Sequence, residues 1–432
     1  MATTYPTGIR IYNLFPRLLG PMSRWIEHLG RIKDMEFDWV FVNPFHYPGF
    51  SGSLYAVKDY YRFNPLFLSR PEADGWREFG RFIRAAHDLS LKVMMDLVIN
   101  HTAIDCELTR THPDWYLHEA DGRIKSPSCI DPADANKVTV WGDLAEIDNS
   151  GSPDRQALWD YWNRLVQTYM EAGIDGFRCD AAYQVPGELW EYLISAARSR
   201  GPVLFFAETL GATEEKIVEI ARSGFEYVSN SSKWWDFTAE WCLKQHDMTR
   251  KYTASVSFPE THDTPRLSQE SGGNPEICKQ RYLFAALFST GLMMPIGYEY
   301  GFRRQLNVVH TMPADWEDPG YDLTGFIRQV NKLKAGYRIF NEDNPTGLIG
   351  SRNPEVAVLK KTSLDDQQSA WLVINKNPHC PQHIRLNAQT SPEHAKGISE
   401  LSLDKSPSPL RLESQAASIE LAPSQIRVFM TD

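Results

Sequence analysis

The chain has 432 residues, which is more than one compact core needs, so the length predicts several domains or one large barrel with additions. Hydrophobic residues make up 42% and charged residues 23%, as in ordinary globular proteins. The 45 basic and 55 acidic residues give a net charge of −10, which argues against a nucleic-acid binder and favours a small or neutral partner.

The first segment, "MATTYPTGIRIYNLFP", has no basic stretch followed by an apolar one, and this predicts a cytoplasmic start. A mature chain with a replaced leader would look similar. No window approaches the length of a membrane span, so no membrane partner is expected. The cysteines show no CxxC spacing, which predicts reduced, buried thiols in place of a zinc site or disulfides. They are Cys106, Cys129, Cys179, Cys242, Cys278 and Cys380.

Eight short apolar segments alternate with helical patterns along the first three quarters of the chain. Their composition suits strands buried on both faces, and strands alternating with helices predict a parallel (β/α)8 TIM barrel, an α/β fold. The helical pattern at 22–35, for example, places Met22, Trp25 and Leu29 on one face. The predicted strands lie within 8–15, 38–44, 92–101, 173–180, 202–209, 225–230, 254–263 and 291–297.

Two regions depart from this alternation. The interval between the third and fourth strands is too long for one loop and one helix, so residues 102–150 are predicted to form an inserted, loop-rich domain B. After the last barrel helix, short alternating runs separated by turns predict an antiparallel β-sandwich, domain C, at 345–432. The catalytic barrel, domain A, is then 1–101 and 151–344.

Chemically active side chains collect at the carboxyl ends of these strands, where the active sites of such barrels form. A single acid at a strand end is more often a helix cap, and a single histidine is usually structural, but four strand ends that converge on one rim are hard to explain as caps. The residues are Asp96, Asn100 and His101, then Arg178 and Asp180, then Glu208, and finally His262 and Asp263.

Two of these acids have surroundings that predict different protonation states. Arg178 lies two residues before Asp180, on the same face of a strand, and a cation there favours the ionised carboxylate. Glu208 follows the apolar run "VLFFA", where desolvation favours the protonated acid. One ionised and one protonated carboxyl group are what retaining glycoside hydrolysis requires, and a separation of roughly 5–5.5 Å is expected between them.

The sequence resembles the α-amylase family, glycoside hydrolase family 13, over the barrel and the tail. The resemblance rests on four motifs and on two supporting segments, "SLYAVKDYY" at 53–61 and "GLMMPIGYEYG" at 291–301. The motifs are "DLVINH" at 96–101, "GFRCDAA" at 176–182, "FFAETLG" at 205–211 and "FPETHD" at 258–263. A weaker similarity, in "YNLFP", "NPFHYPGFSGSLYA" and "HPDWY", points to the family's bacterial maltosyltransferases.

The resemblance implies a role for each motif residue. Asp180 is the implied nucleophile, Glu208 the acid/base and Asp263 the acid that grips two sugar hydroxyls. The ring of Tyr55 is implied to stack on the sugar in the −1 subsite. The implied contacts of substrate further include Asp96, His101, Arg178, His262, Tyr183 and Gln184.

Three residues depart from the family pattern. Thr261 replaces the usual Asn of the fourth motif, and Tyr183 and Gln184 replace the Lys and His that many α-amylases use on the acceptor side. Neither replacement carries a positive charge, so short neutral acceptors are expected. Asn100 and Asp143 are candidate ligands of a structural calcium ion, although two oxygens fall short of a full shell. No cofactor is expected to be required.

The expected function is therefore a retaining hydrolase acting on α-1,4-linked glucose oligosaccharides through a covalent glycosyl-enzyme. The alternative is glucosyl or maltosyl transfer, because hydrolases and transferases share that intermediate. A third reading is a non-catalytic sugar-binding or chaperone-like barrel, although all three acids are present. The segment "KWWDF" at 233–237 predicts either core packing or a sugar platform. The sequence does not indicate the oligomeric state.

Overall fold

The structure is a computed structural model that describes residues 8–131, 134–387, 397–403, 408–409 and 416–431. Eight parallel strands close into one barrel, which confirms the predicted (β/α)8 fold, and each strand lies within its predicted segment. In order around the barrel, the strands are β1 (Arg10–Leu14), β2 (Trp39–Val42), β5 (Lys92–Leu97), β10 (Gly176–Cys179), β11 (Leu204–Ala207), β12 (Tyr227–Ser229), β13 (Ala254–Ser257) and β14 (Gly291–Pro295).

Alternation of side chains along each strand separates two apolar layers. In β2, Trp39 and Phe41 point into the barrel, where they join Met94 and Phe206 in the interior cluster. The other β2 residues, Val40 and Val42, face outward into the larger core between strands and helices. Because both faces of the strands are covered, the segments are apolar almost throughout, and this is the signal that the sequence carried.

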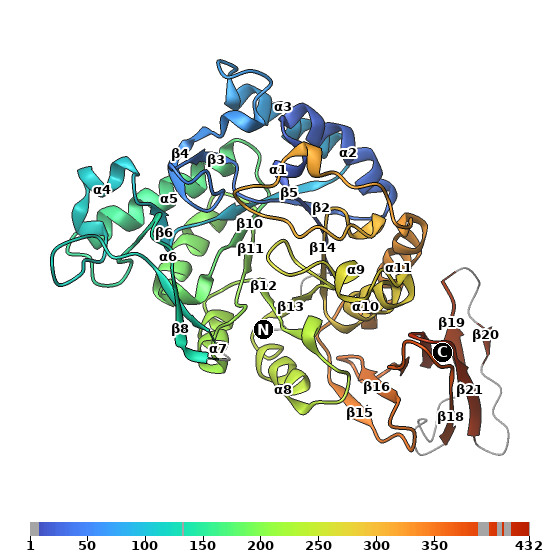
Figure 1. Ribbon diagram of the computed structural model, residues 1–432. Helices are drawn as coiled ribbons and strands as arrows, with labels where there is room; N and C mark the ends of the chain where they lie inside the picture. Colours follow the sequence, from blue (N-terminus) through green and yellow to red (C-terminus); the bar gives the residue numbers. More distant parts are fainter. Residues whose placement is uncertain (1–7, 132–133, 388–396, 404–407, 410–415, 432) are drawn as a thin grey trace.

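Helices surround the barrel (Figure 1). A typical one is α3, whose N-cap residue Asp74 accepts a side-chain hydrogen bond from the Arg77 backbone N–H. It buries Phe79 and Phe82 against the strands. The helices of the barrel are α1 (Pro16–Leu19), α2 (Met22–Asp34), α3 (Gly75–Asp88), α5 (Arg155–Glu171), α6 (Gly187–Arg198), α7 (Glu214–Arg222), α8 (Glu240–Thr249), α9 (Leu267–Glu270), α10 (Pro275–Phe288) and α11 (Thr324–Gly336).

The insertion after β5 contains short elements beside the barrel (Figure 1, cyan). They are β6 (His101–Ala103), α4 (Glu107–Thr111), β7 (Ser128–Asp131), β8 (Asp134–Val140) and β9 (Leu144–Glu146). β6 pairs with β9, and β7 pairs with β8. A further hairpin, β3 (His46–Pro48) with β4 (Val57–Phe63), was not predicted from the sequence. It precedes α3 and contains no long apolar run, so no sequence pattern predicted it.

The C-terminal part is antiparallel, as predicted. Two sheets, of six and two strands, pack through a shared cluster that includes Trp371 from one sheet and Ile419 from the other. The predicted strand at 410–414 lies outside the described residues. The exact domain boundaries stay a prediction. The strands are β15 (Thr346–Ile349), β16 (Val356–Thr362), β17 (Ser369–Asn375), β18 (Gln382–Asn387), β19 (Ile398–Leu401), β20 (Ser408–Pro409), β21 (Ala416–Leu421) and β22 (Ile426–Thr431).

A buried lysine of β16 connects this part to the barrel. The Lys361 ammonium donates hydrogen bonds to the carbonyls of Leu287 and Phe288, at 2.7 and 2.6 Å. These carbonyls end α10 and have no partner within the helix, so the side chain satisfies groups that burial would otherwise leave unpaired.

Replacement of Lys361 by Met is therefore expected to lower the free energy of unfolding by about 2–3 kcal/mol, because two buried carbonyls lose their donor. The matched control is Lys360→Met, since Lys360 is its neighbour on the opposite face of β16 and lies 5.9 Å from the ring of Trp371. Urea unfolding of both variants measures the difference. Equal losses of stability would contradict a capping role for Lys361.

Four of the predicted buried thiols are confirmed, because Cys106, Cys179, Cys242 and Cys278 are buried and free. The prediction was wrong for Cys380, which is exposed, because it lies in the turn before β18 and not in an element packed against the core. The Cys129 side chain lies outside the described residues.

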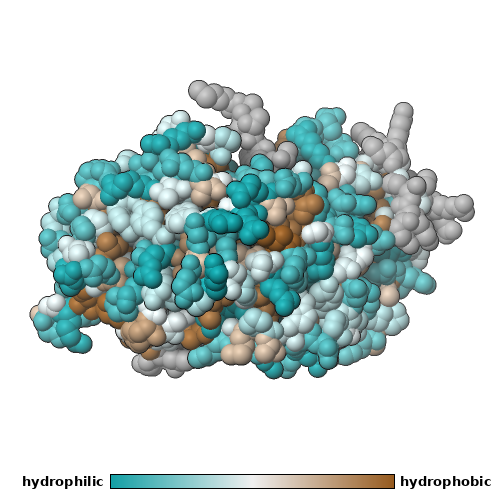
Figure 2. All heavy atoms as spheres, turned by 90° about the horizontal axis from the view of Figure 1, so that it is seen from above, coloured by the Kyte–Doolittle hydropathy of each residue, from teal (hydrophilic) through white to brown (hydrophobic). Residues whose placement is uncertain are grey.

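Figure 2 shows one face that is mainly hydrophilic and is interrupted by small hydrophobic areas. Among the helices that the structure describes, none combines the length and the apolar character needed to cross a membrane.

Candidate active site

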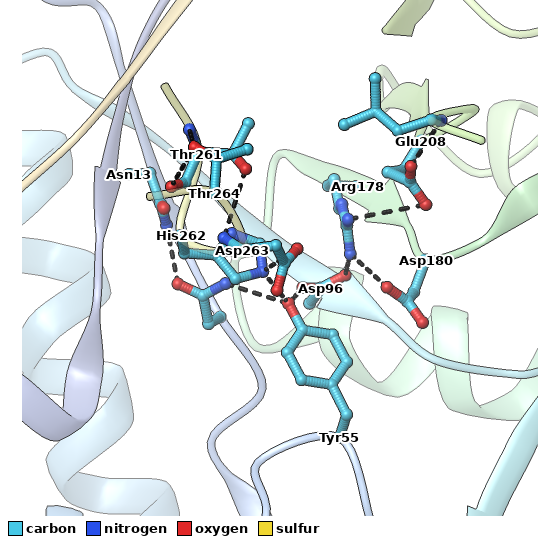
Figure 3. A network of polar contacts seen from close by, with 12 residues as sticks. Asn13, Tyr55, Asp96, Arg178, Asp180, Glu208, Thr261, His262, Asp263 and Thr264 are labelled. Carbon is cyan, nitrogen blue, oxygen red and sulfur yellow. Dashed lines mark hydrogen bonds and ion pairs between the residues drawn. The ribbon is translucent and has the colours of Figure 1, made fainter. Parts of the chain in front are cut away.

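The predicted residues meet at the carboxyl ends of the barrel strands. Arg178 of β10 lies opposite Asp96 of β5 in the parallel register, so their side chains are neighbours. Asp180 and Glu208 directly follow β10 and β11, and His262 and Asp263 follow β13 by a short loop. Figure 3 shows these side chains in one connected network.

Arg178 is the centre of one half of this network. One guanidinium nitrogen, Nη1, donates to Asp96 at 2.8 Å and to Asp180 at 2.6 Å, and the other, Nη2, lies 3.8 Å from Glu208. Its side chain is 5% exposed. A cation buried in this way is stable only with anionic partners, so the arginine and the acids fix one another's positions.

Glu208 has the surroundings of a proton donor. Burial raises the pKa of Glu208 to about 7, and the opposing effect of Arg178 is partly offset by Asp180. Its two oxygens accept backbone hydrogen bonds from Ala181 at 3.0 Å and from Leu210 at 2.6 Å. The raised pKa falls on the acid predicted to hold a proton, whereas Asp180, whose side chain is similarly buried, makes the shorter contact with Arg178.

A strained turn places these two acids side by side. Ala181, the residue after Asp180, adopts a left-handed conformation with φ of 40° and ψ of 47°. This conformation is unfavourable for a residue with a Cβ atom, and it is often found where function constrains the backbone. It directs the Ala181 N–H to Glu208, and Ala182 donates to the Glu208 carbonyl at 3.0 Å.

Tyr55 is the centre of the other half of the network. Its hydroxyl lies 2.7 Å from Asp96 and 2.7 Å from Nε2 of His262, and it accepts a hydrogen bond from Asn43 at 3.0 Å. The hydroxyl has one proton, which it donates in its hydrogen bond to the Asp96 carboxylate. His262 must then donate from Nε2, which also lies 3.0 Å from Asp263. The network thus requires a proton on Nε2 of His262.

The charges of Asp96 and Asp263 follow from their neighbours. Burial raises the pKa of Asp96 to about 6, although Arg178 opposes this rise, so the group is ionised at neutral pH. For Asp263 desolvation also raises the pKa, but His262 and Arg178 outweigh it and hold the pKa below its usual range. The Asp263 side chain is 59% exposed and is available to a ligand.

A cavity of about 500 Å³ opens above this network. The predicted acceptor residues Tyr183 and Gln184 line it, and Gln184 accepts a hydrogen bond from Asn100 at 3.1 Å. His101 also lines it, with Nε2 3.1 Å from the Tyr55 carbonyl, and burial lowers the pKa of that histidine. The other lining residues are Ser53, Tyr55, Pro127, Trp141, Asp143, Leu144, Asp180, Ala181, Asp263, Val308 and Val309.

The two candidate calcium ligands, Asn100 and Asp143, both line this cavity. Oδ1 of Asn100 is buried without a partner, as a metal-ligating oxygen would be before the ion binds. Calcium takes six to eight oxygens, however, and these two residues do not supply them. Within the described residues, no group of three or more His, Cys, Asp or Glu side chains could hold a metal. A structural calcium ion therefore stays a prediction.

Two buried asparagines were missed by the sequence reasoning. Asn13, in β1, donates to Asn43 at 2.8 Å, and Asn43 donates to the Tyr55 hydroxyl. Both are fully buried. They hold Tyr55 from β1 and the end of β2, which lies between β1 and the strand β5 that carries Asp96. Their signal in the sequence is weak, because it consists only of an amide near the end of an apolar strand.

A second missed pair supports the loop that carries His262 and Asp263. Arg266 donates to Glu260 at 2.8 Å, and the other Glu260 oxygen accepts from the Leu267 backbone at 2.6 Å. Both side chains are 1% exposed. The pair closes the loop at its base, so the two site residues project from a fixed turn.

Comparison with known protein families and sequences gives several matches. Residues 5–121 match the family described as glycogen debranching enzyme, glucanotransferase domain. An α-1,4-glucan:maltose-1-phosphate maltosyltransferase of Burkholderia pseudomallei is 25% identical over 397 residues, which are 87% of this chain and 33% of that protein. The enzyme of the same name from Salinibacter ruber is 23% identical over 85% of this chain and 59% of its own length. The chain thus spans less than two thirds of these relatives.

Solved structures share the fold over nearly the whole chain. A noncanonic maltogenic α-amylase of Thermotoga neapolitana has a TM-score of 0.78 at 19% identity, with 98% of each chain covered. An α-amylase of Geobacillus thermoleovorans, complexed with acarbose, has a TM-score of 0.78 at 16% identity and the same coverage. The sequence matches thus show similarity to α-1,4-glucan:maltose-1-phosphate maltosyltransferases, and the solved α-amylase structures show the same fold.

Proposed function

We propose that the chain is a glycoside hydrolase family 13 enzyme that cleaves α-1,4-linked glucose chains with retention and passes the sugar to a sugar acceptor or to water. The observation that carries this proposal is the shared guanidinium of Arg178, which contacts both Asp180 and Glu208. Because one guanidinium faces both carboxyl groups, the two acids lie close together, and we infer the short spacing of retaining enzymes.

The proposed reaction has two displacements. A carboxylate oxygen of Asp180 attacks the anomeric carbon, the glycosidic C–O bond breaks, and Glu208 gives its proton to the leaving oxygen. The Glu208 carboxylate then takes a proton from the acceptor hydroxyl, whose oxygen attacks the same carbon and displaces Asp180. Asp263 and His262 hold hydroxyls of the sugar that changes shape during both steps.

The relatives favour a sugar acceptor slightly over water. The sequence alone placed hydrolysis first, but the similar sequences are transferases by name, and the two reactions share every step up to the glycosyl-enzyme. We therefore place transfer of a glucosyl or maltosyl unit first and hydrolysis second. The non-catalytic alternative finds no support in a site with all three acids in contact with partners.

The charge of the cavity favours a neutral donor over a sugar phosphate. Three carboxylates, of Asp143, Asp180 and Asp263, line it, and its described lining includes neither Lys nor Arg. Phosphate sites normally use those cations or helix N-termini. The proposed substrates are therefore malto-oligosaccharides. Three expectations from the sequence stay predictions: no nucleic-acid or membrane partner, a cytoplasmic location and no required cofactor.

Incubation with maltotetraose is expected to give both shorter and longer oligosaccharides, because the maltosyl-enzyme can be intercepted by a second sugar. Separation of the products by chain length, with and without inorganic phosphate, is the measurement. Shorter products alone would leave hydrolysis as the function. A strict requirement for phosphate would contradict the neutral donor, and no change at all would leave the non-catalytic alternative.

A further inference from the structure

Two neighbouring tryptophans after β12 have opposite surroundings. Trp235 is fully buried and its indole N–H donates to the Ala239 carbonyl at 2.7 Å, so it belongs to the core. Trp234 is 52% exposed. The first of the two readings of "KWWDF" therefore holds for Trp235, whereas core packing does not explain Trp234.

The backbone that carries Trp234 is firmly held. It belongs to the 3₁₀ helix η4 (Ser232–Trp234), in which the Trp234 N–H donates to Ser231 at 3.1 Å. The buried Ser232 donates from its hydroxyl to Ser257 at 3.0 Å, and its N–H donates to Asn230 at 3.1 Å. The backbone that carries the exposed ring is thus already ordered and need not become ordered when a ligand binds, which saves entropy.

The Trp234 ring is backed from within and open outward. Its edge meets Phe258 at a centroid distance of 6.4 Å and an interplanar angle of 86°. The Lys233 ammonium lies 5.6 Å from the ring centroid, and that side chain is 5% exposed and pairs with Glu270. The part of the Trp234 ring that contacts neither Phe258 nor Lys233 is therefore open to solvent.

Several contacts place this ring on the rim next to Glu208. β12 pairs with β11, and Thr209, the residue after Glu208, bonds to Ser229 through its N–H and its hydroxyl, each at 2.9 Å. Phe258, which the Trp234 ring touches, belongs to the interior cluster against which Leu210 packs. Leu210 in turn donates its N–H to Glu208.

We propose that Trp234 is the stacking platform of an acceptor subsite that takes a neutral glucosyl unit. This inference rests on the proposed function. Glu208 protonates the leaving oxygen, so the leaving and incoming sugars lie on its side, away from the sugar held by Asp263 and Tyr55. A pyranose ring presents C–H groups on its faces, which pack on an aromatic ring without any charge.

Acceptor kinetics test this platform. With α-maltosyl fluoride as donor and maltotriose as acceptor, Trp234→Ala is expected to raise the acceptor KM by about tenfold or more, the equivalent of one stacking contact. Fluoride release without acceptor should stay within about twofold of wild type, because the donor side is untouched. Trp234→Phe should restore most of the affinity. Trp241→Ala is the control, since Trp241 is 39% exposed on α8.

An acceptor KM for Trp234→Ala within about twofold of wild type would overturn the proposal. Loss of fluoride release in Trp234→Ala would also overturn it, because the ring would then act on the donor side.

A binding measurement separates failure of the platform from failure of the proposed function. If the wild type neither cleaves nor transfers, the proposed function fails, and calorimetry with maltohexaose decides about Trp234. In the Asp180→Asn background, Trp234→Ala is expected to weaken binding by about tenfold, and Trp241→Ala to leave it unchanged. Equal affinity of the two double variants would contradict the platform.

Discussion

Asp180→Asn is expected to lower kcat on maltotetraose by roughly 10⁴-fold or more, because an amide oxygen does not form the glycosyl ester. Oligosaccharide binding should stay measurable, since Asp263, His262 and Tyr55 keep their contacts with one another. The measurements are steady-state kinetics and calorimetric binding of maltotetraose.

Asp143→Asn is the matched control for this variant. It removes the same charge from the same cavity, but Asp143 is not part of the network around Arg178. Its activity is expected within about tenfold of wild type. Activity of Asp180→Asn within that same range would refute its assignment as nucleophile.

Glu208→Gln is expected to lower kcat/KM on maltotetraose by roughly 10³-fold, because the leaving oxygen loses its proton donor. The wild-type enzyme should show kcat/KM falling as the pH rises through about 7, the pKa of Glu208, since only the protonated form is competent. This limb should vanish in Glu208→Gln. A pH profile of both proteins measures it.

The substrate supplies the control for Glu208→Gln. A fluoride leaving group needs no proton, so glycosylation by α-maltosyl fluoride should fall far less than cleavage of maltotetraose. Equal losses on both donors would contradict the acid role.

The raised pKa of Glu208 also makes the free energy of unfolding depend on pH. The folded state favours the protonated acid, so this contribution to stability is present below the unfolded pKa and is lost as the pH rises through about 7.

The barrel could be predicted because its strands are buried on both faces and its helices on one. Such burial leaves apolar runs in the sequence that bound each element, as in β2 and β5. The acids could be predicted because the end of each run marks the rim where active sites form. The place of Asp180 and Glu208 on one rim therefore follows from chain position, and their catalytic roles stay a prediction.

The remaining features depend on contacts between distant segments. Asn13 and Asn43 matter only because Tyr55, from another loop, reaches them. Trp234 and Trp235 are adjacent and identical in type, and only packing separates the exposed ring from the buried one. In the sequence Lys361 resembles a surface lysine of an antiparallel sheet, and only its contact with the end of α10 explains its burial. Sequence patterns reveal periodic burial along one element, and contacts between distant segments leave no such pattern.

The central claim is a covalent intermediate on Asp180, and trapping it is the most direct test. In Glu208→Gln, α-maltosyl fluoride can glycosylate the nucleophile, but no base activates the acceptor, so the ester should accumulate. Digestion at low pH and mass spectrometry are expected to find one maltosyl unit on the peptide that contains Asp180. An adduct on another residue, or turnover that releases the β-anomer first by NMR with no adduct, would contradict the account.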